Sequence, residues 1–166
     1  MHDKNRNILD ESVNVDSLRR IAVKVMGSCL MIPLLACGKG EQKMKKETVL
    51  ALVLYSYLNR PIHDIVFSGT HIGVANAYGG TGIITSVRIP FGRQVLSWTL
   101  GGPEGMARNG ENVQIKNSMQ ISREQISAQT RYIGIHLYPD DTAELSFAEF
   151  IPERTIRGAK IMAERK

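Results

Sequence analysis

The feature that most constrains the fold is a succession of short apolar segments, rich in β-branched and aromatic residues, that end repeatedly at glycine or proline. The first segment, residues 48–58, is followed by Pro61, which cannot donate a hydrogen bond to a strand ladder. Short segments of this composition, separated by turn residues, favour strands over helices. The strand-like segments are 48–58, 62–69, 71–78, 82–90, 93–100, 112–119, 131–139 and 142–150.

This succession predicts an all-β fold, an antiparallel β-sandwich or partly open barrel of about seven or eight strands. Residues 48–58 are expected to form a central strand, with a helix as the alternative because the segment also contains Leu and Ala. Only the tail, residues 154–166, indicates a helix, and Gly158 weakens that prediction because glycine is a poor helix former.

Two pairs of neighbouring segments are predicted to form hairpins. Residues 132–138 and 142–150 are joined by a Pro-Asp-Asp turn at 139–141, in which proline fixes φ and the aspartate side chains can bond to the backbone. Residues 82–90 and 93–100 are separated by only two residues, one of them a glycine. Both pairs therefore fit antiparallel neighbours in one sheet.

An apolar run near the N-terminus, residues 25–36, follows a basic segment. Its 12 uncharged residues are fewer than the roughly 20 that span a bilayer, and Pro33 would remove a backbone donor from a core helix. The hydrophobic region of a signal peptide, roughly 7–15 residues long, fits better. Residues 1–36 are therefore predicted to be a removed signal peptide. The alternatives are a cleaved signal without lipid and a buried helix that carries an ordinary core cysteine.

The apolar run ends in "LLAC", residues 34–37, which resembles the lipobox of bacterial lipoproteins. The resemblance implies that Cys37 is acylated, becomes the new N-terminus and anchors the protein, each buried methylene contributing about 0.8 kcal/mol. Gly38, where retained lipoproteins carry aspartate, favours the outer membrane of a Gram-negative bacterium, on its periplasmic face. Residues 37–47 are then the lipidated N-terminus and a flexible tether, and 48–166 form the β-sandwich domain.

The sequence contains no motif for a nucleophilic, metal or nucleotide site. An enzyme would have to gather His63, His71 or His136 with carboxylates in one pocket. His63 and Asp64 are expected to point to opposite faces of a strand and not to pair, and His136 to be a half-buried structural residue. We therefore expect no enzyme activity, no cofactor and no metal site. The basic residues are scattered rather than arranged in a stripe, so no nucleic-acid groove is expected.

Residues 101–111 form a long glycine-rich segment without strand character. Long loops on a rigid β scaffold commonly carry binding, and the alternative is a connector with no role. The candidate partner-binding residues are Glu104 and Arg108 in this loop and Asp140 and Asp141 in the hairpin turn, although turn chemistry alone explains both aspartates.

The order of these features resembles a group of small β-rich bacterial lipoproteins, whose members are often encoded beside phospholipase toxins of the type VI secretion system. The resemblance covers residues 55–150 and is carried by the lipobox and by "YLNRPIHDIVFSG", "NAYGGTG", "SVRIP", "VLSWTL" and "IHLYPDDTAELSF". It implies a membrane-anchored periplasmic immunity protein that binds and occludes a lipase toxin. The alternative is a structural or envelope-assembly accessory lipoprotein with no toxin partner.

Overall fold

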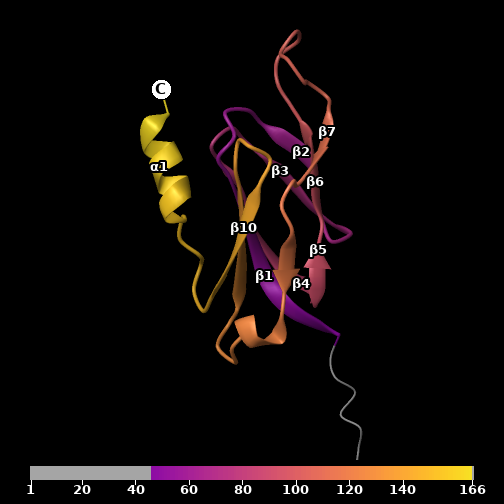
Figure 1. Cartoon of the computed structure of the whole chain (residues 1–166), viewed down its shortest axis with the longest axis vertical. Coiled ribbons are helices and arrows are strands. Elements are labelled where there is room, and N and C mark those ends of the chain that lie inside the picture. Colours follow the sequence, from indigo (N-terminus) through magenta and orange to yellow (C-terminus); the bar gives the residue numbers. More distant parts are fainter. Residues whose placement is uncertain (1–45, 166) are drawn as a thin grey trace, which may run out of the picture. The chain divides into compact units, whose positions relative to one another are not determined.

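Strands dominate the part of the chain that the structure, a computed structural model, describes, residues 46–165 (Figure 1). One short helix, α1 (Ile156–Glu164), and a 3₁₀ turn, η2 (Arg123–Gln125), complete the secondary structure of those residues. The all-β prediction is confirmed, and so is the helix in the tail. The strands are β1 (Glu47–Ser56), β2 (Ile62–Phe67), β3 (Thr70–Ala75), β4 (Gly80–Pro90), β5 (Gly92–Gln94), β6 (Leu96–Leu100), β7 (Asn112–Gln114), β8 (Met119–Ile121), β9 (Tyr132–Leu137) and β10 (Ala143–Ala148).

The strands of this described part form two four-stranded sheets and one two-stranded sheet. Sheet A has the order β10-β9-β1-β4, sheet B has the order β3-β2-β6-β7, and β5 pairs with β8. The paired strands are antiparallel except β1 and β9, which run parallel. A parallel pair needs a long crossover connection, and the strands of sheet B, which lie between β1 and β9 in the sequence, belong to that connection. The sandwich therefore contains a mixed sheet.

Between residues 46 and 165 there are ten strands rather than the expected seven or eight, because two predicted segments divide. Residues 93–100 contribute to both β5 and β6, which belong to different sheets. Residues 112–119 form β7 and the first residue of β8, and these strands pair with β6 and β5 respectively. Each of the divided segments crosses from one sheet to another.

The predicted hairpin between residues 82–90 and 93–100 is wrong. β4 pairs with β1 in sheet A, whereas β6 pairs with β2 and β7 in sheet B. The chain turns between the sheets at Gly92, which has a φ of +103°. The buried Gln94 side chain fixes this corner, because its Nε2 donates to the carbonyls of Pro90 at 2.7 Å and Gly92 at 2.9 Å. The second predicted hairpin is confirmed as β9 and β10.

The facing sides of the sheets enclose an aliphatic core. Alternate residues of β1, namely Leu50, Leu52 and Leu54, are at most 5% exposed, and Trp98 of β6 is fully buried. Full burial of a Leu or Ile side chain contributes roughly 1.5–3 kcal/mol. The inner face of sheet A thus follows the period-two alternation of its sequence.

The outer face of sheet A carries a layer of aromatic rings. The His136 ring stacks on Tyr55 with centroids 5.2 Å apart, and Tyr57 stacks on Tyr138 at 5.3 Å. The Nδ1 atom of His136 lies 3.1 Å from the Tyr57 hydroxyl, and its Nε2 lies 3.0 Å from the Ser146 hydroxyl. His136 is fully buried instead of half-buried, and burial lowers the pKa of its imidazole. Stacking and hydrogen bonds on both ring nitrogens hold the His136 ring in this layer.

The C-terminal segment 150–158, called the strap below, crosses this aromatic layer. The hydroxyl of Tyr55 donates a hydrogen bond to the Pro152 carbonyl. Gly158 lies so close to the Tyr57 ring that a Cβ at this position would overlap it. The glycine that weakens the helix in isolation is therefore what lets α1 pack on sheet A.

The predicted signal peptide, Cys37 and tether residues 38–45 lie outside the described residues. In the part of the chain that is described, no helix is long and apolar enough to cross a membrane. The acylation of Cys37 stays a prediction.

Candidate functional site

The domain has two ends, which hold different strand ends and loops (Figure 1). The tether end holds the start of β1, the start of β9 and the end of β10, because β1 and β9 run parallel and β10 antiparallel to β9. The loop end holds the end of β1, the 101–111 loop and the 139–142 turn. The ten residues of β1, at about 3.3 Å each, separate the two ends by about 33 Å.

Arg60, shortly after β1, holds the 101–111 loop in place. Its Nε donates to the Gly101 carbonyl and its Nη1 to the Ala107 carbonyl, both at 2.8 Å. Only 9% of Arg60 is exposed, so a buried cation organises the base of the loop. The backbone N–H of Gly110 also donates to the Leu100 carbonyl, which closes the loop. The 101–111 loop is therefore built on the sandwich at both of its ends.

Arg108 connects this loop to the hairpin turn. Its Nε and Nη2 donate to the Glu111 carboxylate at 2.8 and 2.9 Å, and these hydrogen bonds lower the pKa of Glu111. Arg108 Nη2 also lies 3.7 Å from Asp141 Oδ2, and Lys116 Nζ lies 3.0 Å from the same oxygen. The Asp141 side chain is only 5% exposed, whereas that of Arg108 is 47% exposed. Asp141 thus positions two cations, and Arg108 presents its charge to solvent.

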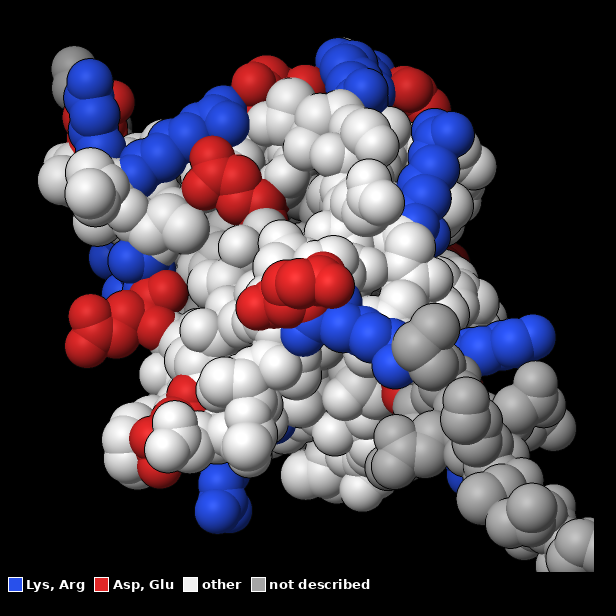
Figure 2. Space-filling model, turned by 60° about the horizontal axis from the view of Figure 1, so that its bottom comes forward, with Lys and Arg blue, Asp and Glu red and all other residues white. Residues whose placement is uncertain are grey.

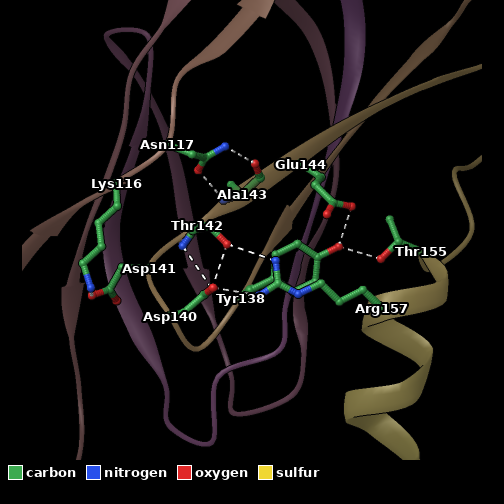
Figure 3. Close-up of polar contacts among 10 residues, drawn as sticks. All are labelled: Lys116, Asn117, Tyr138, Asp140, Asp141, Thr142, Ala143, Glu144, Thr155 and Arg157. Carbon is green, nitrogen blue, oxygen red and sulfur yellow. Dashed lines mark hydrogen bonds and ion pairs between the residues drawn. The ribbon is translucent and has the colours of Figure 1, made fainter.

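Asp140, the neighbouring residue, joins the turn to α1 (Figure 3). Arg157 Nη2 donates to Asp140 Oδ2 at 2.8 Å, and the Thr142 hydroxyl donates to Oδ1 at 2.7 Å. The hydrogen bond from Thr142, followed by the contact with Arg157, lowers the pKa of Asp140. The Arg157 guanidinium also lies over the Tyr138 ring, 3.8 Å from its centre. The Asp140 side chain remains 55% exposed.

Two further sets of contacts fix the residues beside the turn (Figure 3). The Tyr138 hydroxyl donates to Glu144 at 2.8 Å and lies 2.6 Å from the Thr155 hydroxyl, and burial raises the pKa of Tyr138 to about 12. The Asn117 side-chain amide both accepts from the Ala143 N–H and donates to the Ala143 carbonyl, each at 2.8 Å. Asn117 thus occupies a position that a further strand would take at the edge of β10.

Three of the four predicted partner-binding residues lie together at the loop end. Arg108 contacts Asp141, and Asp140 is adjacent in the same turn. Glu104 is exposed on the 101–111 loop. Both the loop and the turn are held by side chains that the sequence did not single out. These are Arg60, Lys116 and Arg157.

The three histidines of the domain occupy different environments. His136 is buried in sheet A, whereas His63 and His71 lie on neighbouring strands of sheet B. The expectation that His63 and Asp64 do not pair is wrong, since His63 Nδ1 lies 2.9 Å from Asp64 Oδ2. Asp64 has a φ of +50° and the register of β2 shifts there, so strict alternation is broken. Across residues 46–165, no three His, Cys, Asp or Glu side chains gather as a metal site.

A shallow hollow of about 210 Å³ lies between residues 93–95 and 114–118. Its lining includes Lys116 and Asn117, which also fix the hairpin turn, but no carboxylate and no histidine. The hollow is therefore a hydrogen-bonding surface beside the loop end and contains no acid–base pair.

No family model matches the chain, and a search of curated proteins found no relative. Function is therefore inferred from the residues themselves. In the described domain, the loop end combines the 101–111 loop held by Arg60, the 139–142 turn, and exposed charges of both signs.

Proposed function

We propose that this chain is a lipid-anchored periplasmic immunity protein, whose loop end binds a secreted phospholipase toxin of the type VI system and covers its active-site mouth. The observation that carries the proposal is the placement of the 101–111 loop and the 139–142 turn. Both lie at the end of the domain that is opposite to the start of β1. The predicted tether from Cys37 leads into the start of β1. A domain held through that tether is free to turn its loop end away from the membrane.

The contacts within the loop end favour binding because they order its surface in advance. A loop that is already held by Arg60 loses little conformational freedom when a partner docks. The exposed charges of Glu104, Arg108 and Asp140 include both signs, and they suit a partner with a complementary charge pattern. Arginine is also a frequent energetic anchor of protein interfaces.

The proposed location follows from the N-terminal sequence. Acylation of Cys37 would hold the protein on the periplasmic face of the outer membrane, where an incoming phospholipase threatens the producer's lipids. Occlusion of the toxin needs no catalytic group and no cofactor on this chain. The partner in this account is a protein, and the membrane is contacted through the anchor.

Co-purification tests the proposal. A soluble chain that begins at Gly38 is mixed with the product of an adjacent phospholipase-like gene, and the wild type is expected to retain it. The paired variant Glu104→Arg with Arg108→Glu is expected to lose it, because both exposed loop charges are reversed. Arg88→Glu, an exposed position opposite Val49 near the start of β1, is the matched control and is expected to bind normally.

Two outcomes would contradict this function. Failure of the wild-type chain to bind or inhibit the phospholipase would remove the toxin as partner and favour an envelope-assembly accessory lipoprotein. Binding that survives the loop reversal but is lost in Arg88→Glu would move the interface away from the loop end.

A further inference from the structure

Three of the exposed apolar side chains lie at the tether end of the domain. Phe150 is 75% exposed and Ile151 is 52% exposed, and both lie in the segment that leaves β10. Val49, near the start of β1, is 57% exposed. Isolated exposed apolar residues are ordinary, but a large aromatic ring next to a second apolar side chain in one turn offers contact area to an apolar partner.

The register of sheet A places these residues at the same end. Ala51 pairs with Tyr132 across the parallel strands, and Tyr132 pairs with Ala148 across the hairpin. Phe150 lies in the bend that directly follows Ala148, and Val49 precedes Ala51 by two residues, so both lie near the tether end of sheet A. Figure 2 brings this end forward and shows uncharged surface between scattered basic and acidic side chains.

Val49 also faces the same side of sheet A as the strap. Leu50 and Leu52 point into the core, so the alternate residues Val49 and Ala51 belong to the outer face. The strap reaches that outer face immediately after Ile151, where the Tyr55 hydroxyl bonds to the Pro152 carbonyl. The apolar side chains thus lie where the outer face of sheet A meets the tether end.

The length of the tether identifies what can cover this surface. Nine residues, 38–46, separate Cys37 from Glu47, the first residue of β1. The ten steps from Cys37 to Glu47 span at most about 36 Å when fully extended, at 3.3–3.6 Å per residue. An acylated Cys37 therefore limits how far the start of β1 can lie from the bilayer, whereas the loop end is separated from the start of β1 by about 33 Å.

We propose that Phe150 and Ile151, with Val49 at the same end of sheet A, form a membrane-contacting surface that rests on the phospholipid bilayer holding the Cys37 anchor. This inference rests on the anchor of the proposed function but not on the identity of the toxin. The apolar side chains enter the interfacial region of the lipid, and the acyl chains supply the attachment. Contact at this end orients the domain so that the 101–111 loop faces away from the membrane.

The basic side chains of the tether support a phospholipid surface as the partner. Residues 38–46 contain Lys39, Lys43, Lys45 and Lys46 against the single acidic Glu41. Such a segment is attracted to anionic headgroups when it lies within a Debye length of them. The lysines of the tether would then be attracted to the lipid headgroups, and the apolar side chains would contact the apolar part of the same bilayer.

The test uses single-cysteine labelling of the full acylated protein. The processed chain contains no cysteine other than Cys37, whose sulfur is blocked by the lipid, so a Phe150→Cys variant takes one environment-sensitive fluorophore. The protein is reconstituted into vesicles of phosphatidylethanolamine with a smaller share of phosphatidylglycerol. Val74→Cys is the matched control, because Val74 is 62% exposed and lies next to Ala75, which pairs with Ile62 near the loop end.

The label at position 150 is expected to shift to shorter wavelength and to become several-fold less accessible to a water-soluble quencher. The label at position 74 is expected to remain accessible. Equal accessibility at both positions would overturn the proposal, and so would equal shielding, which would mean that the domain lies flat. Toxin inhibition by the soluble chain is measured separately. If the soluble chain inhibits the toxin but the label at position 150 shows no membrane contact, this inference is wrong and the proposed function stands. A mass spectrum without acyl chains on Cys37 would also overturn it.

Discussion

The two ends of the domain are built on opposite principles. The loop end is held by buried and half-buried ions, in which Arg60 bonds two carbonyls and Asp141 positions Arg108 and Lys116. The tether end exposes apolar side chains such as Phe150, which contribute little to the fold where they stand. The difference between a surface ordered in advance and an apolar one is the reason why we propose a specific protein partner for the loop end and a lipid surface for the tether end.

The largest expected effect comes from removing the cation under the loop. Arg60→Met should lower the free energy of unfolding by about 3 kcal/mol, because two hydrogen bonds from a buried charged donor are lost and the accepting carbonyls are left unpaired. Denaturant unfolding of the soluble domain measures this loss, and limited proteolysis should show faster cleavage within residues 101–111.

Arg88→Met is the control for that prediction. Its side chain is 78% exposed near the tether end, so the change should stay within about 0.5 kcal/mol. Equal losses of unfolding free energy for the Arg60 and Arg88 variants would show that the loop end is not held more firmly than the rest of the surface.

A second, smaller effect is expected from the helix that supports the loop end. Gly158→Val should cost about 2 kcal/mol, because the new side chain overlaps the Tyr57 ring and pushes α1 off sheet A. Arg157 would then lose its ion pair with Asp140. Ala159→Val, on the exposed side of the same helix, should cost much less. Hydrogen exchange of α1 distinguishes detachment of the helix from a general loss of stability.

The aromatic layer between the two ends predicts a pH dependence. Burial lowers the pKa of His136 below the value of about 6.5 that the unfolded chain has. As the pH falls below about 6.5 the unfolded state therefore binds a proton that the folded state excludes, and stability decreases with a slope of at most about 1.4 kcal/mol per pH unit. His136→Gln should be less stable at neutral pH but should lack this component. An unchanged pH slope in the variant would assign the dependence to other groups.

The smallest effect is expected at the tether end. The paired change Phe150→Ser with Ile151→Ser should alter the free energy of unfolding by less than about 0.5 kcal/mol, because both side chains are largely in solvent. Phe67→Ser, a fully buried comparison, should cost several times more. A large loss from the exposed pair would show that this surface stabilises the fold and is not available to a membrane.

The sequence predicted the fold class because period-two alternation and turn residues are local signals. The turn at 139–141 and the two strands beside it were recognisable in this way, and Asp141 adopts the positive φ that the turn requires. The hairpin expected around Gly92 failed because nothing local shows whether two consecutive strands stay in one sheet. Gln94 fixes the change of sheet by bonding to carbonyls that only the folded corner brings together.

The candidate site was predictable only in part for the same reason. Arg108, Asp140 and Asp141 could be singled out from a loop and a turn. Their structural partners could not be, because Arg60 lies 47 residues from one of its bonded carbonyls and Arg157 lies 17 residues from Asp140. His63 and Asp64 show the opposite failure, in which a local rule on strand alternation was broken by a positive φ.

Inhibition of a phospholipase encoded beside this chain, the partner in the proposed function, is the most direct test of the proposal that the loop end binds a toxin. The dissociation constant is obtained from the concentration dependence of phospholipase activity for the wild type, for Arg108→Glu and for Arg88→Glu. The account predicts a loss of at least about 30-fold for Arg108→Glu, equivalent to an interface anchor worth about 2 kcal/mol, and a change within about threefold for Arg88→Glu. Equal affinity of both variants, at wild-type strength, would contradict it.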